Sequence, residues 1–293
     1  MYVRSRSETM YQVILHVMVI IVAIASVFPL IYVLGMSLTT QPELIARHYF
    51  VIIPHEPTLE AYRRIITSPL IWNSFLISVI RSVVGPLLTL VFTLIGAYVL
   101  SHRTLPGRNA MLFFILATIL FGGGLIPTYL VVKDLHLIDS LWSLIIPGLV
   151  DSFGLLVIKI FIENLPDGLM DSAKIDGAGE IQTLVHVVIP LAAPALAAIG
   201  LFGVVSHWNS WFDALIYLND ANKYPLQLVL KNMLTGQVIG DQFRQTMIQD
   251  SARITPESMK MATVIFGILP ILCVYPFLQK HFIKGMYLGA VKG

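Results

Sequence analysis

Charged residues are scarce in this chain of 293 residues. Asp, Glu, Lys and Arg make up 12% of it, whereas 56% is hydrophobic and the mean hydropathy is +0.80. A soluble globular domain has about twice that share of charge. The composition therefore predicts an integral membrane protein. The 19 basic and 17 acidic residues nearly balance and form no basic face in the sequence, which argues against a nucleic-acid surface.

Cysteine and the common catalytic motifs are nearly or wholly missing. The single Cys273 lies in an apolar run, which excludes a disulfide framework and a thiolate metal site. The sequence has no glycine-rich Walker loop, so the chain is not expected to bind ATP itself. It also has no His-Glu-x-x-His metal motif and no Gly-x-Ser-x-Gly elbow. We therefore expect no catalytic residues, no metal and no cofactor in this chain. An intramembrane active site built on His207 and Asp213 is the alternative, but it lacks an identifiable nucleophile or metal partner.

Long apolar runs dominate what is present. Each is long enough for a hydrocarbon core of about 30 Å, which needs roughly 20 residues of helix. The runs cover residues 13–38, 72–100, 111–132, 141–162, 187–218 and 261–278. They predict an all-α domain over residues 13–278 with six transmembrane helices, between a short polar segment 1–12 and a tail 279–293. The first run lacks a small-residue cleavage site and is predicted to be an uncleaved anchor. Thr58 to Thr67 is predicted to form a short surface helix.

The basic residues of the loops indicate the orientation. With the amino terminus inside, the inner and outer segments carry equal numbers of Lys and Arg. The outer ones mostly lie in two long loops, which the positive-inside rule discounts, whereas the short loop from His102 to Arg108 and the tail count fully. The loop charges alone favour two cytoplasmic termini without deciding the orientation, and the resemblance that residues 163–186 carry supplies most of the weight for this prediction. Residues 219–258 then form a long extracytoplasmic loop.

The most polar stretch between two apolar runs is the loop of residues 163–186. Its charged residues cannot lie in lipid, where each would cost about 3 kcal/mol. Pro166 is placed to begin a short helix, Gly177 to end it with a left-handed turn, and a second helical run starts near Ile181. The pattern predicts a helix, a glycine turn and a second helix that project from the membrane and can transmit force to a soluble protein.

The residues of this loop resemble those of a known family. Asp171-Ser172-Ala173, then Asp176-Gly177-Ala178, then Val187-x-Ile189-Pro190 with a further Pro194, resemble the cytoplasmic coupling loop of bacterial ABC importer permeases. Asp171 and Ser172 stand where Glu and Ala are usual. The segments Leu125 to Tyr129 and Trp208 to Leu218, and the tail from Lys280 to Gly293, are also similar to carbohydrate importers. The maltose-type oligosaccharide importers are resembled most, in particular their second membrane subunit and members that carry uronate-containing sugars.

The resemblance implies the fold and the partners. It implies a type I importer permease in the bacterial inner membrane, with a coupling helix between the fourth and fifth spans. A sister permease would complete the pathway as a heterodimer, two separate subunits would bind ATP and magnesium, and a solute-binding protein would deliver the sugar. The loop 219–258 would help to receive that protein, or else is a solvated loop without a partner. The residues expected to couple the chain to the ATPase are Asp171, Ala173, Asp176, Gly177, Ala178, Glu180 and Pro190.

Two segments are candidates for the sugar pathway. Phe121 to Tyr129 contains three glycines and Pro127, which predicts an interrupted helix that lines a cavity, or else close helix packing through small residues. Ser206 to Asp213 is rich in aromatic, amide and carboxylate groups, which suit sugar C–H faces and hydroxyls. An aromatic belt at the outer membrane interface is the alternative for this second segment. The candidate pathway residues are Tyr129, Trp208, Asn209, Trp211 and Asp213.

Polar groups inside the spans need partners. Arg81, in the second run, is expected to pair with a buried acid or a helix end rather than to bind substrate, although it is also the clearest intramembrane candidate for an acidic sugar. Asp151 and Lys159 are expected to face the helix bundle. An ion-coupled secondary transporter is the main rival to the importer, but such folds are built from internal repeats and none is evident here.

Overall fold

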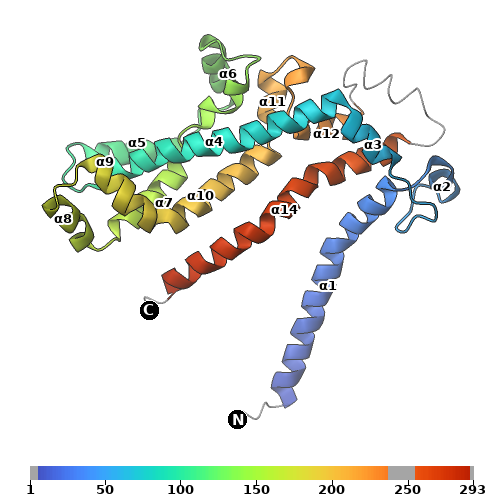
Figure 1. Ribbon diagram of the computed structural model, residues 1–293, viewed down its shortest axis with the longest axis horizontal. Helices are drawn as coiled ribbons and strands as arrows, with labels where there is room; N and C mark the ends of the chain where they lie inside the picture. The colour runs from blue at the N-terminus through green and yellow to red at the C-terminus, as the bar shows by residue number, and fades with distance from the viewer. Residues whose placement is uncertain (1–5, 237–254, 291–293) are drawn as a thin grey trace. The chain divides into compact units, whose positions relative to one another are not determined.

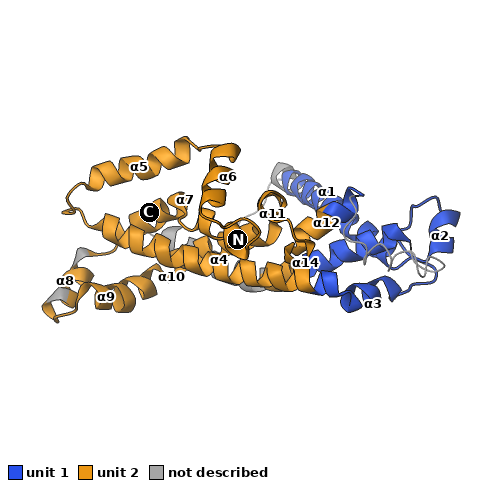
Figure 2. Ribbon diagram, turned by 90° about the horizontal axis from the view of Figure 1, so that it is seen from above, with its two compact units in different colours: residues 1–72, 232–269 blue, residues 73–231, 270–293 orange. Residues whose placement is uncertain are grey.

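The computed structural model describes residues 6–236 and 255–290, and within these ranges it contains helices, turns and loops but no strand (Figure 1). The chain divides into two compact units (Figure 2). The first consists of residues 1–72 and 232–269, and the second of residues 73–231 and 270–293. All the candidate site residues named above belong to the second unit.

The first unit contains α1 (Arg6–Ser37), α2 (Gln41–Ala46), α3 (Glu60–Thr67) and the start of α14 (Pro256–Ala290). Helix α1 is apolar all round, and its most apolar stretch buries none of its residues within the chain. A small core joins the C-terminal end of α1 to α2, with Met36, Leu44 and Val51 buried together. The surface helix expected at Thr58 to Thr67 is confirmed as α3.

Two long helices organise the second unit. Helices α4 (Pro69–Ser101) and α10 (Ile189–Asn209) lie close enough to need glycine at their contacts. A Cβ on Gly200 would lie 2.7 Å from Leu90 Cδ1, and a Cβ on Gly203 would lie 3.1 Å from Pro86 Cβ. Small residues are the usual means of packing helices in a membrane, where apolar side chains gain little from leaving lipid.

Helix α7 (Ser152–Glu163) packs against this pair. The shared core contains buried side chains from α4, α7, α10 and the turn of π-helix before α10. Its members are Leu94, Ala97, Tyr98, Leu100, Leu155, Ile158, Ile162, Val188 and Ile199. At the C-terminal end of α7, Glu163 pairs with Lys159 (2.8 Å) and with Arg108. Lys159 therefore faces protein, as the sequence predicts.

The third and fourth runs are not straight helices. Helix α5 (Arg108–Leu120) ends before the glycines, and α6 (Leu125–Asp134) leaves at 115° to it. The expected interruption is therefore present, and a Cβ on any of the three glycines would meet no described atom of this chain closer than 4.0 Å, so close packing within the chain does not explain them. In the fourth run, 3₁₀ turns over residues 141–148 precede α7, with a 46° bend. Among the described residues, four helices are long enough to span a membrane, or six if each bent pair is one span.

Two sequence boundaries need correction. The fifth run was expected to continue to residue 218, but α10 ends at Asn209 and a separate helix, α11 (Phe212–Tyr217), follows. Residues 219–258 were expected to form one long loop, but α12 (Leu226–Leu234) lies within this range and α14 begins in it at Pro256. Leu226, Leu228 and Val229 are fully buried, and the Leu226 amide donates to Ser78 Oγ on α4 at 2.8 Å. Residues 237–254 of that loop lie outside the described residues.

The glycine contact makes a first prediction. Leucine at Gly203 should force α4 and α10 apart, because its Cβ already lies within contact distance of the rigid Pro86 ring. We expect a loss of about 1–3 kcal/mol and a lower Tm of the purified protein. Gly122→Leu is the matched control, since nothing lies within 4 Å of its Cβ. Equal Tm values for the two variants would show that the close approach is not needed.

Candidate functional site

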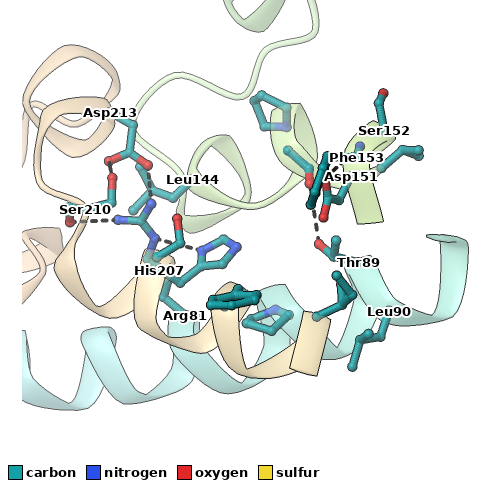
Figure 3. A pocket seen from close by; sticks show the side chains of 18 of the residues that line it. Arg81, Thr89, Leu90, Leu144, Asp151, Ser152, Phe153, His207, Ser210 and Asp213 are labelled. Atoms are coloured by element: carbon teal, nitrogen blue, oxygen red, sulfur yellow. Dashed lines mark hydrogen bonds and ion pairs between the residues drawn. The ribbon is translucent and has the colours of Figure 1, made fainter. Parts of the chain in front are cut away.

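A cavity of about 740 Å³ lies in the second unit, between α4, α10 and the start of α7. Figure 3 shows two polar groups of side chains on its wall, one around Arg81 and the other around Asp151. Apolar side chains such as Leu90, Leu144 and Phe202 line the wall as well. A cavity of this size with a few placed polar groups is typical of a small-molecule site.

Arg81 is the buried centre of the first group. Its side chain is 2% exposed, and its Nη2 pairs with Asp213 Oδ2. Its Nη1 donates to the Ser210 carbonyl at 3.2 Å, and its Nε donates to His207 Nδ1 at 3.3 Å. A guanidinium at this depth is tolerated only with such partners. Arg81 was expected to pair with a buried acid or a helix end, and it does both, although the acid, Asp213, is only partly buried.

The same contacts fix the break between α10 and α11. Arg81 binds a carbonyl at the C-terminal end of α10, which has no partner within the helix. Asp213 lies in the first turn of α11, where its Oδ1 accepts from Ser210 Oγ (2.8 Å) and from the Ala214 amide (2.9 Å). The sequence analysis missed this break. The Ser210-x-x-Asp213 spacing is a helix-start signature that could have located it.

Glycine allows His207 to enter this group. A Cβ on Gly85 would lie 2.7 Å from His207 Cε1, so the imidazole packs directly on the α4 backbone. The ring lines the cavity beside Arg81 and Ser206. Because the guanidinium donates to Nδ1, this nitrogen is the acceptor and Nε2 carries the ring proton. Nε2 lies on the ring edge that packs against Gly85, 2.8 Å from where a Cβ of that residue would be.

The second polar group lies at the start of α7. Asp151 caps this helix, because its Oδ1 accepts from the Phe153 amide at 3.1 Å. Ser152 Oγ lies 3.0 Å from Thr118 Oγ1, and Thr89 Oγ1 donates to the Gly148 carbonyl at 3.4 Å. Carboxylates and hydroxyls accept and donate the hydrogen bonds that sugar hydroxyls make. The cavity therefore offers such groups at two places on its wall.

The five predicted pathway residues do not form one cluster. Asp213 lines the 740 Å³ cavity. Trp208 is 5% exposed, lies edge-on to Phe75 at 6.0 Å, and lines a separate apolar groove of about 420 Å³. Asn209 is exposed. The Lys231 ammonium lies over the Trp211 ring, 5.5 Å from the ring centroid.

Tyr129 lies on α6 and belongs to another site. Its ring stacks on Tyr217, with centroids 6.3 Å apart and planes 13° apart. Tyr129 also lines a smaller cavity of about 560 Å³ with Lys133 and His136. Because Tyr217 lines the larger cavity, this pair of rings lies between the two cavities. Tyr129 is therefore close to the larger cavity without lining it.

A polar contact holds the segment between α6 and α7 to the segment after α11. The Asp139 carboxylate accepts from Lys223 Nζ (2.7 Å) and from the Asn219 and Asp220 amides (both 3.1 Å). These hydrogen bonds lower the pKa of Asp139 below its ordinary value of 3.8, and the bond from the Lys223 ammonium contributes most. Asp139 is therefore ionised at neutral pH and holds the two segments together.

The loop of residues 163–186 has the local geometry that the sequence predicts. Helix α8 (Asp167–Ile175) ends at Gly177, whose φ is +78°, and α9 (Glu180–Thr183) follows. The Ala178 amide donates to the Ala173 carbonyl at 2.9 Å, which is a bond of the Schellman type of helix end. Of the predicted coupling residues, Ala173 and Ala178 are partly buried, and the exposed ones are Asp171, Asp176, Gly177, Glu180 and Pro190.

Known proteins share this architecture over the whole chain. No protein-family model matches. The chain is 42% identical over 268 residues to Protein LplC of Bacillus subtilis (strain 168), with 92% of this chain and 90% of that protein covered. It is 38% identical over 286 residues to the polygalacturonan/rhamnogalacturonan transport system permease protein YtcP of the same organism, with 97% and 99% covered.

A solved structure agrees. A chain from a bacterial ABC transporter involved in the import of the acidic polysaccharide alginate superimposes with a TM-score of 0.89 and 30% identity, with 96% of this chain and 100% of that chain covered. The chain therefore belongs to the permease subunits of sugar ABC import systems. It is a multi-pass membrane protein for transport and not an enzyme, so the secondary transporter and the intramembrane enzyme are set aside.

The Arg81 group makes a second prediction. Asp213→Ala leaves a buried guanidinium without its carboxylate, which costs about 3–5 kcal/mol in a fully buried pair. The cost should be smaller here, because the Asp213 side chain is 27% exposed and water can reach it. We expect a lower Tm for Asp213→Ala, and recovery of most of the loss when Arg81→Met is added. An unchanged Tm for Asp213→Ala would mean that His207 and Ser210 suffice to hold Arg81.

Proposed function

We propose that this permease forms half of the translocation pathway for an oligosaccharide. A non-identical sister permease would supply the other half, two separate subunits would bind ATP with magnesium, and a solute-binding protein would deliver the sugar. Each bent helix pair would count as one span, which gives six spans with both termini in the cytoplasm of a bacterial cell. The observation that carries this proposal is the match over nearly the whole chain to a subunit of an alginate importer.

The cavity supports a sugar as the cargo. Its wall offers Asp213, Ser210 and His207 in one group and Asp151 and Ser152 in the other. These side chains suit hydroxyl groups, and the apolar side chains between them suit the C–H faces of a sugar ring. The sugar would lie in this cavity while the pathway is open to the outside.

The relatives suggest that the cargo is acidic. One is named for polygalacturonan and rhamnogalacturonan, and the solved structure belongs to an importer of an acidic polysaccharide. In this chain, however, the guanidinium that lines the cavity is 2% exposed and already paired, whereas its partner carboxylate is 27% exposed. We therefore infer that this subunit holds hydroxyls of an acidic oligosaccharide, and that the sister subunit or the binding protein holds its carboxylates.

Uptake into proteoliposomes tests the cargo. The permease would be reconstituted with its sister subunit, the ATP-binding subunits and the binding protein, and supplied with labelled oligogalacturonides or with galactose oligomers of the same length. We expect ATP-dependent uptake that is faster for the acidic sugar. Faster uptake of the neutral sugar would contradict an acidic cargo. Uptake that required an ion gradient and no ATP would contradict the importer itself.

The loop of residues 163–186 would be the contact with the ATP-binding subunits. Helices α8 and α9 are joined by the left-handed Gly177, which fixes the angle between them. Ile175 and Ile181, on either side of this turn, are 84% and 78% exposed. Apolar side chains in a polar loop outside the membrane are suited to a protein partner. Closure of the ATP-binding subunits would move this loop, and with it the helices that line the cavity.

Substitution at Gly177 tests the coupling. A β-branched residue cannot adopt a φ of +78° without strain, so Gly177→Val should change the angle between α8 and α9. We expect the variant to insert and to assemble, to retain ATP hydrolysis, and to lose most of its uptake. Gly168→Ala is the matched control in the same loop, since nothing lies within 4 Å of its Cβ. Normal uptake by Gly177→Val would contradict the role of this turn.

A further inference from the structure

A side chain of the coupling loop reaches back to α4. Glu180 is the first residue of α9, and its carboxylate is 65% exposed. Tyr98, near the C-terminal end of α4, donates its hydroxyl to Glu180 Oε2 at 2.5 Å. His102 Nε2 lies 3.6 Å from the same oxygen. Among the described side chains of residues 164–183, Glu180 is the one that forms a hydrogen bond with α4, while Met170 packs against the core that α4 shares with α7 and α10.

Tyr98 is held firmly on the α4 side. It is 7% exposed and belongs to the core that α4 shares with α7 and α10. The His102 ring packs edge-on against it, 4.8 Å away, while His102 Nδ1 donates to the Tyr98 carbonyl at 2.9 Å. The phenol hydroxyl therefore has a fixed position, from which it can hold the mobile end of a loop.

Helix α4 connects this contact to the cavity. Residues 81 and 98 of α4 are 17 positions apart, which is about 26 Å along a helix at 1.5 Å per residue. At the cavity, Arg81 binds Ser210 and Asp213 at the end of α10. Helices α4 and α10 run alongside each other between these two polar contacts (Figure 1). Pro86 has no amide proton, so one backbone hydrogen bond of α4 is missing at this residue. Gly203 of α10 packs on Pro86 and supports α4 at this position.

Only one of the two helices follows the loop directly. The chain continues from α9 through a turn of π-helix into α10, so α10 must follow any movement of the loop. Helix α4 has no such covalent continuation with it. The packing of α4 on α10 joins the two helices along their length, and a hydrogen bond at the loop end adds a directional contact there that opposes sliding of one helix along the other.

We propose that Tyr98 is the residue that makes α4 follow the coupling loop, through its hydrogen bond to Glu180. The displacement that ATP binding imposes on the loop then reaches the Arg81 group through α4 and α10 together. Tyr98 is a positioning residue in this scheme and touches neither sugar nor nucleotide. The inference rests on the proposed coupling function of the loop.

Tyr98→Phe tests the inference in the reconstituted complex. The variant keeps the ring in the core and removes only the hydroxyl. Because the lost hydrogen bond is the polar link between α4 and the loop, we expect the sugar transported per ATP hydrolysed to fall severalfold while hydrolysis continues. Tyr11→Phe, at a 64% exposed tyrosine on α1, is the matched control and should leave the ratio unchanged.

Two substitutions of Glu180 separate the hydrogen bond from charge. Glu180→Gln keeps an oxygen that can accept from Tyr98 and should retain coupling, whereas Glu180→Ala should behave like Tyr98→Phe. Loss of coupling in both variants would assign the link to the charge facing His102 and overturn the role of Tyr98. A normal ratio in Tyr98→Phe, or loss of hydrolysis together with uptake, would also overturn it. If the wild-type complex does not transport sugar with ATP, the proposed function itself fails.

Discussion

The neutralisation of Arg81 is the constraint on which the cavity depends. A guanidinium inside a spanning helix must find acceptors in the protein, because lipid offers none. Its acceptors are more than 120 positions away in sequence, at the end of α10 and the start of α11. Satisfying one buried charge therefore fixes where α10 stops, where α11 begins and how Asp213 is presented. The glycines at positions 85 and 203 let α4 and α10 approach closely enough for these contacts.

The elements that depend on local chemistry could be predicted from the sequence. Hydropathy located the apolar runs, and Pro166 and Gly177 located the helix, turn and helix of residues 163–186, because turn residues act through their own backbone. The three glycines after Phe121 indicated the interruption of the third run. The 115° angle there could not be predicted, since it depends on packing between segments that are distant in sequence.

The candidate site was harder to predict, for the same reason. Hydropathy continues across Ser210, so the break between α10 and α11 was hidden within an apolar run. Residue type identified Trp208 and Asp213 equally as sugar-binding groups, but it does not show which side of a helix faces a cavity. The structure places the Trp208 ring against Phe75 and the Asp213 carboxylate on the cavity wall. The sequence predicted that Arg81 needs a partner, but only the structure identifies Asp213 as that partner.

Exposed apolar residues have different meanings in α1 and in the loop of residues 163–186. Along α1 they are expected of any helix in lipid, where exposure of an apolar side chain costs nothing, so they say little about protein partners. In the polar loop of residues 163–186, exposure to water costs about 25 cal/mol for each Å² of apolar surface. Ile175 and Ile181 bear that cost beside a turn whose geometry is fixed by Gly177. A protein partner that covered Ile175 and Ile181 would remove this cost, and the loop is therefore suited to bind one.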